Sequence, residues 1–340
     1  MSHPEKALPA NRMGRPKSGV IWAYRFDGSG QPSPVALDDA MRPHGPGEGF
    51  LWIHLDFVDR LARDWVAGID WLGPAARRLL LSPDDYPALE YDSDAVWGRF
   101  ADTLQDPDED SDRTVPMRFA LGPGYLVSGR RHPVRAAALA RKKIESGHVV
   151  GGPVALFEMM IDQVLRAIAE TLRASRAEAD SIEDRVLDES LHDESRRLGP
   201  LRRTAVKLHR QLSGLRSILR EFAEDEHVDG SHVASRAAAE RLLRRIETLD
   251  QEVQEVQDRA RFLQDEIAAK LATISNRHLY VLSVMTALLM PPTLVTGFFG
   301  MNTGGLPFLE GAHGWISASL IGGLASGCTL LLLKRLGFFE

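Results

Sequence analysis

LYVLSVMTALLMPPTLVTGFFG, residues 279–300, is the stretch that decides the fold, because it contains no charged side chain. At 1.5 Å per residue, a helix of this length covers the roughly 30 Å hydrocarbon core of a bilayer. A second apolar stretch, WISASLIGGLASGCTLLLL, occupies residues 315–333. Neither stretch has a polar face broad enough to meet water, so we favour two transmembrane helices over the alternative, a buried hairpin in a soluble protein.

Flanking charge orients the two spans. Basic residues stand just before the first span and just after the second: Lys270, Arg277, His278, Lys334 and Arg335. The connecting loop, residues 301–314, has no Lys or Arg. Because positive charge gathers on the cytoplasmic side of a membrane, we expect a cell inner-membrane protein with the loop outside. Both ends of the chain, including the tail 334–340, would then be cytoplasmic.

Residues 153–278 have the pattern of a long helical stalk. Two helices are expected over residues 154–190 and 194–226, and a third begins near Ser231 and continues into the first span. Apolar residues of the third helix recur at steps of three and four, which is a heptad seam that needs a partner helix. The seam consists of Leu242, Ile246, Leu249, Val253, Val256, Ala260, Leu263, Ile267, Leu271 and Ile274. We interpret it as a coiled coil that packs the long helices of neighbouring copies together, with charged residues on its solvated flanks.

Residues 20–152 have the short apolar runs, broken by Gly, Pro and Asp, that are typical of strands and turns. Strands are expected over residues 21–26, 50–55, 95–100, 118–121 and 125–128, and short helices over residues 61–68 and 74–81. The last two strands would form a hairpin around Gly122-Pro123-Gly124. This pattern predicts a compact cytoplasmic α/β domain. The acidic run 106–112 within it indicates a solvated loop or, as the less favoured alternative, a patch that collects cations.

Bulk composition excludes several classes of protein. The chain has 340 residues, 44% of them hydrophobic, and its net charge of −6 gives no general attraction to nucleic acid. Cys328 is the single cysteine, so there is neither a disulfide framework nor a Cys-based metal site. Residues 1–19 lack the apolar core of a secretory signal and are typical of a flexible tail.

Small or mildly polar residues line one side of the first span. At 100° per residue they fall within about a third of the helix circumference. The stripe consists of Asn276, Leu279, Ser283, Thr286, Met290, Thr293 and Gly297, with Leu282 at its margin. Hydroxyl and amide oxygens without carboxylates would hold a hydrated cation weakly, as conduction requires. The alternative is that the hydroxyls bond to carbonyls of their own helix. Because one chain cannot enclose a pore, several copies would have to ring it.

Two further features concern helix packing in the membrane. Pro291 and Pro292 remove helix hydrogen bonds, so a kink or local opening is expected there. Neighbours or pore water would have to satisfy the freed carbonyls. In the second span, Ser319, Gly323 and Gly327 repeat every four residues, a spacing that favours close packing against the first span.

The tripeptide Gly300-Met301-Asn302 ends the first span, after a long cytoplasmic helix and before a short loop and a second span. In this position it resembles the signature of the CorA superfamily of divalent metal ion transporters. Residues 52–56, Trp-Ile-His-Leu-Asp, also resemble a segment of that family, so the likeness covers most of the chain. It implies an α+β fold: a cytoplasmic α/β N-terminal domain, a long helical stalk and two C-terminal transmembrane helices, assembled as a funnel-shaped homopentamer.

The resemblance also implies roles for individual residues. Asn302 would form the outer ring that receives the hydrated cation, and Gly300 would allow close approach of the chains. The positions that match pore-lining residues of the family are Asn276, Leu282, Met290 and Thr293, in agreement with the stripe.

The loop after the tripeptide, with Gly-Gly-x-Pro at residues 304–307, is similar to the ZntB zinc-transporting branch. Glu310 is its one carboxylate and would attract cations. The branch implies Zn²⁺ as the transported ion, moved inward with protons, whereas the alternative is a Mg²⁺ or Co²⁺ channel of the same family; Ni²⁺ is a further candidate. Neither span contains an Asp or Glu that would relay protons.

Other chemistry finds little support in the sequence. No His-Glu-x-x-His or Cys/His set predicts a high-affinity zinc site within one chain, and we expect only transient contacts of zinc with His278 and His313. No phosphate-binding loop, nucleophile elbow or cofactor motif is present, so we expect no enzyme and no resident cofactor. A rival from another class is a membrane-tethered coiled-coil scaffold, which would need neither the stripe nor Gly-Met-Asn.

Overall fold

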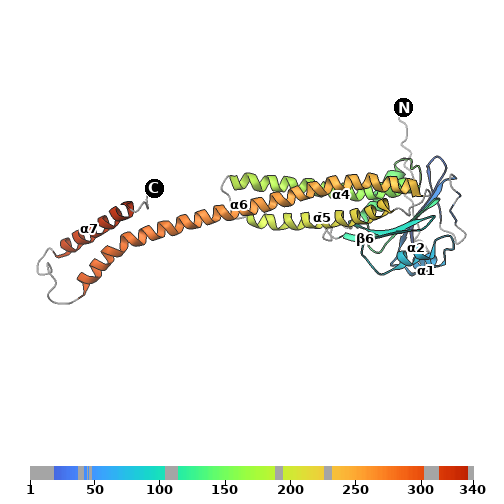
Figure 1. Ribbon diagram of the computed structural model, residues 1–340. Helices are drawn as coiled ribbons and strands as arrows, with labels where there is room; N and C mark the ends of the chain where they lie inside the picture. The colour runs from blue at the N-terminus through green and yellow to red at the C-terminus, as the bar shows by residue number, and fades with distance from the viewer. Residues whose placement is uncertain are drawn as a thin grey trace, which may run out of the picture. The chain divides into compact units, whose positions relative to one another are not determined.

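The computed structural model describes residues 19–36, 42–43, 45, 48–103, 114–187, 194–225, 232–301 and 314–335 (Figure 1). The chain divides into two compact units, Met1–Phe262 and Leu263–Glu340. The expected acidic loop, 106–112, and all but the last residue of the expected tail, 1–19, lie outside the described residues.

A seven-stranded sheet forms the centre of the first unit, with strand order β2-β1-β3-β7-β6-β5-β4. The strands are β1 Val20–Phe26, β2 Pro32–Pro34, β3 Phe50–Asp56, β4 Ala88–Tyr91, β5 Val96–Thr103, β6 Thr114–Gly122 and β7 Tyr125–Arg130. Neighbouring strands are antiparallel except β3 and β7, which are parallel. Gly122 pairs with Tyr125, so Pro123 and Gly124 form the turn of the predicted β6–β7 hairpin.

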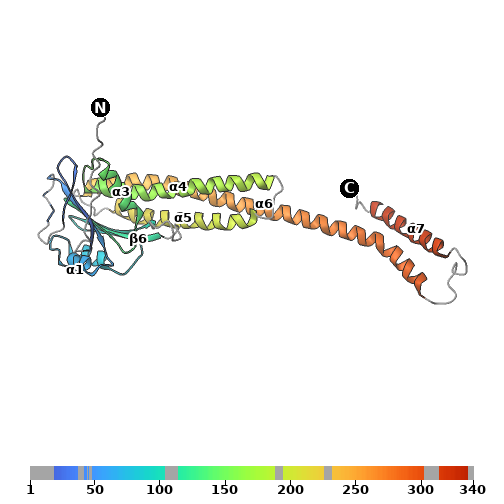
Figure 2. The ribbon, with the colours of Figure 1, turned by 180° about the vertical axis from the view of Figure 1, so that it is seen from behind.

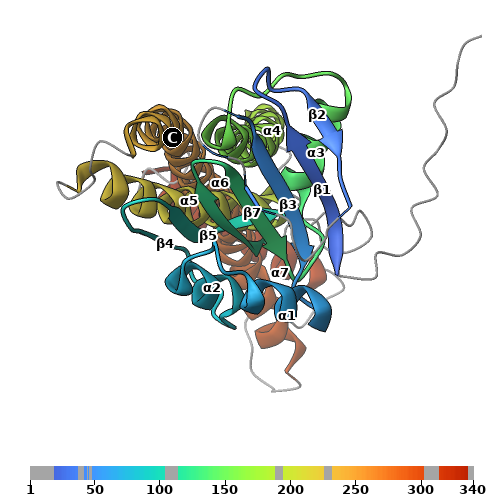
Figure 3. The same ribbon diagram turned by 90° about the vertical axis from the view of Figure 1, so that its right-hand side faces the viewer.

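Helices cover both faces of this sheet (Figure 3). Helices α1 (Arg60–Gly68) and α2 (Pro74–Leu81) share one core with alternate residues of β3, namely Leu51, Ile53 and Leu55. Helix α3 (Arg135–Glu145) and the start of α4 (Pro153–Leu187) lie against the other face. Side chains of a strand alternate between faces, so the fully buried Trp52 and His54 belong to this second layer.

Three long helices complete the first unit: α4, α5 (Glu194–Glu224) and the part of α6 (Val233–Gly300) up to Phe262 (Figure 2). Ion pairs from α4 to α6 join Glu158 to Arg241 and Asp180 to Arg259. From α5, His209 Nδ1 lies 2.6 Å from a carboxylate oxygen of Asp250 on α6. The helices therefore contact one another along their length.

The heptad seam is largely occupied within the chain. Its six members in the first unit, from Leu242 to Ala260, are buried. In the second unit Leu263 and Ile267 are also buried, whereas Leu271 and Ile274 are 37% and 40% exposed. Because α4 and α5 flank this part of α6, the interpretation that the whole seam packs against neighbouring copies is wrong. Only its last two members stay available to a partner.

The elements expected from sequence recur with small shifts of their ends. The helix expected over residues 154–190 ends at Leu187, and the one expected over 194–226 ends at Glu224. Three described elements have no counterpart in the sequence analysis: β2, β4 and the alanine-rich α3. Helix α6 continues through Pro291 and Pro292, so these residues do not end it.

Candidate ion pathway

The second unit contains the two apolar helices, the C-terminal part of α6 and α7 (Gly314–Arg335). Both are long and apolar enough to cross a membrane, and in their most apolar windows 0% and 6% of the residues are buried. Within the described chain they are therefore not the core of a soluble fold. Exposed apolar surface of this kind is suited to lipid or to other membrane helices.

One face of α6 packs against α7. The half-buried residues of this stretch recur at helical spacing: Val284, Ala287, Leu288, Pro291, Pro292, Val295 and Phe299. Gly322 of α7 lies so close that an added Cβ would sit 3.4 Å from Pro292 Cβ. The hydroxyl of Ser326 donates a hydrogen bond of 3.1 Å to the carbonyl oxygen of Leu288.

The predicted stripe lies on the opposite side of α6 and is exposed. Leu282 and Met290 are 61% and 62% exposed, and Asn276, Ser283, Thr286, Thr293 and Gly297 are also exposed. At 100° per residue, the centre of the stripe lies more than a third of a turn from the half-buried face. The structure therefore brings the described stripe residues together on one surface that α7 does not cover.

The hydroxyls of the stripe bond to their own helix. Ser283, Thr286 and Thr293 donate to the carbonyls of Leu279, Leu282 and Leu289 over 2.8, 2.8 and 2.7 Å. This is the alternative considered from sequence, yet it leaves the oxygen lone pairs unused. An oxygen whose proton is engaged in this way can still accept a hydrogen bond from a cation's water shell.

The two ends of the stripe differ in what the structure describes. At the inner end, Asn276 and His278 are exposed. At the outer end, α6 ends at Gly300, where a Cβ would meet nothing within 4 Å, and Met301 is 52% exposed. Asn302, Glu310 and His313 lie outside the described residues.

Metal-binding side chains do not gather in the described part of the chain. Over residues 19–36, 42–43, 45, 48–103, 114–187, 194–225, 232–301 and 314–335, no three His, Cys, Asp or Glu side chains are placed to hold an ion. The first span, residues 279–300, contains no Asp or Glu, so the stripe on α6 presents neutral oxygen and sulfur atoms.

The small residues of α7 that contact α6 differ from those expected. Ser319, Gly323 and Gly327 are exposed, and a Cβ at either glycine would meet nothing within 4 Å. The row that faces α6 lies one position earlier and consists of Ala318, Gly322 and Ser326. The predicted four-residue spacing was right, but the predicted row was displaced by one residue. Both rows repeat every four residues, so the sequence alone does not show which of them contacts α6.

In the first unit, the segment that resembled the family is part of the sheet core. Trp52 Nε1 donates to Ser128 Oγ over 3.0 Å, and His54 Nδ1 lies 2.9 Å from the same oxygen. The His54 ring also stacks on Trp22 with a centroid separation of 4.3 Å. Burial, helped by the charges of Arg130 and Arg141, holds the pKa of His54 well below its usual value. His54 is therefore a neutral structural residue.

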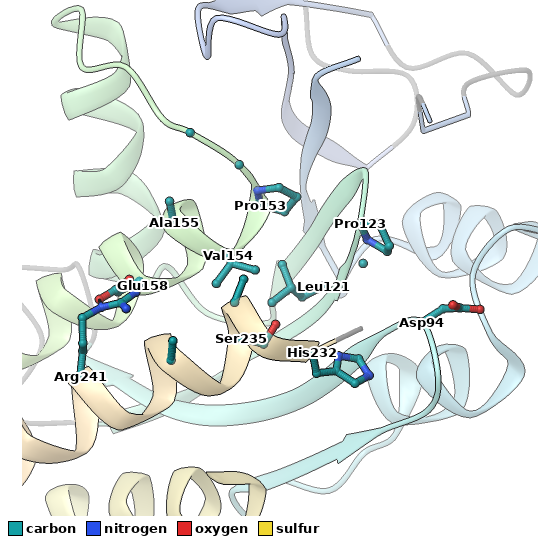
Figure 4. Close-up of a pocket in the computed structure, with 15 residues that line it drawn as sticks. Asp94, Leu121, Pro123, Pro153, Val154, Ala155, Glu158, His232, Ser235 and Arg241 are labelled. Atoms are coloured by element: carbon teal, nitrogen blue, oxygen red, sulfur yellow. Dashed lines mark hydrogen bonds and ion pairs between the residues drawn. The ribbon is translucent and has the colours of Figure 1, made fainter. Parts of the chain in front are cut away.

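A cavity of about 550 Å³ lies where the β6–β7 hairpin meets the starts of α4 and α6 (Figure 4). Arg241 engages both carboxylate oxygens of Glu158 at its edge, over 2.8 and 2.6 Å. His232 Nε2 lies 2.6 Å from the carbonyl oxygen of Asp92. Since the ion pair neutralises Glu158, this cavity lacks the paired carboxylates that a divalent cation prefers.

Comparison with known proteins agrees with this architecture. The family described as CorA-like Mg²⁺ transporter protein matches residues 47–335. The divalent cation transporter CmaX of Pseudomonas aeruginosa is 26% identical over 91% of this chain and 93% of its own length. The zinc transport protein ZntB of Photorhabdus laumondii is 21% identical over 86% and 87%. A solved structure of full-length CmaX superposes with a TM-score of 0.77 at 23% identity, covering 94% of this chain and 98% of that one.

The names of these relatives describe transporters, not enzymes. Since the family match spans most of the chain, from the sheet to the end of α7, the chain belongs to the CorA-like family of divalent cation transporters.

Proposed function

We propose that this chain is a subunit of a zinc transporter in the inner membrane, and that the exposed stripe of α6 lines its ion pathway. The main support for the proposal is the stripe itself, which lies on the otherwise apolar C-terminal part of α6 and is not covered by α7. We divide the chain accordingly into a cytoplasmic domain (20–152), a stalk (153–278), spans at 279–300 and 315–333 with the outer loop 301–314 between them, and a cytoplasmic tail (334–340).

The pathway requires several copies of the chain. A single helix face cannot enclose water, and five copies are our proposal from the family resemblance. Leu271 and Ile274 are the exposed end of the seam and would pack between copies just below the span. Among the described residues, nothing lies within 4 Å of a Cβ added at Gly300. We propose that a glycine is needed here because other copies approach closely around the outer mouth.

The chemistry of the stripe favours zinc over magnesium at one position. Hydroxyl and amide oxygens bind any hydrated divalent cation weakly. Met290 adds a thioether, a soft ligand that suits Zn²⁺ better than Mg²⁺. We place Asn302 in the outer ring, Glu310 as an attractor of cations in the outer loop, and His278 and His313 as transient contacts at the two mouths.

Transport needs no nucleotide. A divalent cation entering across 100 mV gains about 4.6 kcal/mol, which is sufficient for secondary uptake. If the transported ion is Zn²⁺, we propose that its uptake is coupled to proton movement. A Mg²⁺ or Co²⁺ channel is the second candidate, because the description of the matching family names Mg²⁺ as the transported ion.

The test is uptake of Zn²⁺ and of Mg²⁺ into proteoliposomes, with and without an inward proton gradient. Wild type is compared with Asn302→Ala and with a matched control, Ser319→Ala, on the exposed face of α7. We expect zinc uptake that the gradient stimulates, that Asn302→Ala abolishes and that Ser319→Ala retains. Magnesium flux without gradient dependence would establish the channel instead, and no flux of either ion would favour the scaffold.

A further inference from the structure

The double proline of α6 leaves two main-chain carbonyls without their usual donors. In an α-helix, the carbonyl of residue i accepts the amide hydrogen of residue i+4. Pro291 and Pro292 have no amide hydrogen, so Ala287 and Leu288 lose these bonds. Inside a bilayer no lipid atom can replace a missing donor, and an unsatisfied carbonyl is costly there.

Helix α7 supplies the donor for one of the two. The Ser326 hydroxyl donates a hydrogen bond of 3.1 Å to the carbonyl oxygen of Leu288. This is the carbonyl to which residue 292 cannot donate, because it is a proline. One turn away along α7, Gly322 is buried, and a Cβ there would sit 3.4 Å from Pro292 Cβ and 3.5 Å from its Cα. The glycine lets the backbones approach, and the serine then reaches the carbonyl.

We propose that Ser326 is a positioning residue of the ion pathway: its hydroxyl stands in for the missing amide of Pro292 and holds α6 against α7. The bond lies at the level of Met290 and Thr293, which belong to the exposed stripe on the other side of α6. Anchoring the side of α6 that faces α7 fixes the orientation of Met290 and Thr293 on the opposite side. The inference rests on the proposed function in assigning the stripe to the pathway, whereas the replacement of the amide stands on geometry alone.

A double-mutant cycle separates this role from ordinary packing. Ser326→Ala removes the hydroxyl, and Pro292→Ala returns an amide hydrogen to the Leu288 carbonyl. We expect Ser326→Ala to lower zinc uptake about three- to tenfold when residue 292 is proline, in line with the strength of hydrogen bonds between membrane helices. The same substitution in the Pro292→Ala background is expected to change uptake less than about twofold. Ser326→Thr, which keeps the hydroxyl, is expected to restore uptake.

A second measurement does not depend on transport. Cys328→Ser removes the one thiol of the chain, and Met290→Cys then places a reporter on the stripe. In membranes, we expect Ser326→Ala to change the rate at which a water-soluble methanethiosulfonate reagent labels this cysteine about three- to tenfold, and only when residue 292 is proline. Ser319→Ala, on the exposed face of α7, is the control and is expected to leave the rate unchanged.

Equal effects of Ser326→Ala in both backgrounds, in uptake and in labelling, would overturn the proposal, because the serine would then act by packing. An absence of any effect would overturn it as well. If the wild type carries no divalent cation, the proposed function fails, but the labelling cycle still decides whether Ser326 replaces the amide of Pro292.

Discussion

The two units of the chain use apolar side chains in opposite ways. In the first unit, Ile246 and Val253 of α6 are fully buried, and charges on the flanks of the helix are paired with α4 and α5. In the two apolar spans of the second unit, residues 279–300 and 315–333, large apolar residues are exposed and no charged side chain is present. Because one continuous helix takes part in both, helix propensity does not distinguish them. The difference lies in the solvent that each surface is built to meet.

The largest expected effect comes from a charge in the sealed part of the seam. Val253→Asp buries a carboxylate among α4, α5 and α6, so we expect it to lower the free energy of unfolding by about 4 kcal/mol or more. The matched control is Gln251→Asp, at an exposed position of the same helix, with an expected change within about 0.5 kcal/mol. Denaturant unfolding of the full chain in detergent measures both. If Val253→Asp and Gln251→Asp both changed the free energy of unfolding only slightly, the seam would not be buried by helices of its own chain.

A second prediction compares two residues of equal exposure in different surroundings. Phe262 of α6 and Leu324 of α7 are 66% and 67% exposed. We expect Leu324→Lys to disfavour membrane insertion by about 2.5–3.5 kcal/mol, because the charge would face lipid. Phe262→Lys faces water and is expected to change stability by less than about 0.5 kcal/mol.

The measurement is the fraction of each variant recovered in the membrane and the unfolding of the purified protein. If both substitutions are tolerated alike, the exposed surface of α7 does not meet lipid. If Phe262→Lys is the harmful one, that part of α6 is covered by another copy.

The sequence predicted those features of the fold that depend on local periodicity. The two spans, the heptad seam and the β6–β7 hairpin follow from spacings within a few residues of one another. The missed β2 and β4 are short strands of four residues or fewer at the two edges of the sheet, where few contacts constrain the sequence. The missed α3 was hidden because three of its four buried residues, Ala136, Ala137 and Ala140, are alanines, which are too small to stand out as a core face in the sequence.

The remaining errors concern the choice of partner. Periodicity shows that a helix has a buried side, but it does not say which helix covers it, so the seam was assigned to other copies instead of α4 and α5. The same limit explains the shift from Gly323 to Gly322 in α7. The exposed stripe was found because polar residues on an apolar helix are a strong local signal, whereas the contact of Ser326 with Leu288 joins residues 38 positions apart.

A third prediction concerns pH and the first unit alone. His54 is fully buried, and its pKa is held well below its usual value, mainly by burial. The unfolded chain binds this proton near pH 6.5, before the folded protein does, so unfolding becomes easier as the pH falls below about 6.5 and is unaffected by His54 above it. The expected loss is up to about 1.4 kcal/mol per pH unit, until the folded pKa is reached.

Thermal unfolding of wild type and of His54→Asn at pH 7.5 and 5.5 measures the contribution of His54 to the pH dependence of stability. The variant is expected to lose less stability than wild type between the two pH values. Equal losses would mean that His54 is protonated in the folded protein or exchanges freely with water.

The smallest expected effect tests the stripe itself. Thr293 of α6 and Thr329 of α7 each donate a hydrogen bond to the carbonyl four residues earlier, over 2.7 and 3.0 Å. Replacement by valine removes the hydroxyl and keeps the shape at both sites, so any loss of the internal bond is shared. We expect Thr293→Val to lower zinc uptake about threefold, since only this hydroxyl would also accept a hydrogen bond from the hydrated ion. Thr329→Val is expected to leave uptake within the error of the proteoliposome assay.

The outcome separates two uses of the same side chain. A reduced flux for Thr293→Val alone would mean that the oxygen lone pairs of the stripe contact the passing ion, because both variants lose the same kind of internal bond and only Thr293 lies on the exposed stripe. Equal fluxes would mean that the hydroxyls serve their own helix and that the ion is held elsewhere, with Asn302 and Met290 as the remaining candidates. Equal reductions would point to helix stability and would remove the argument that the uncovered face of α6 is the pathway.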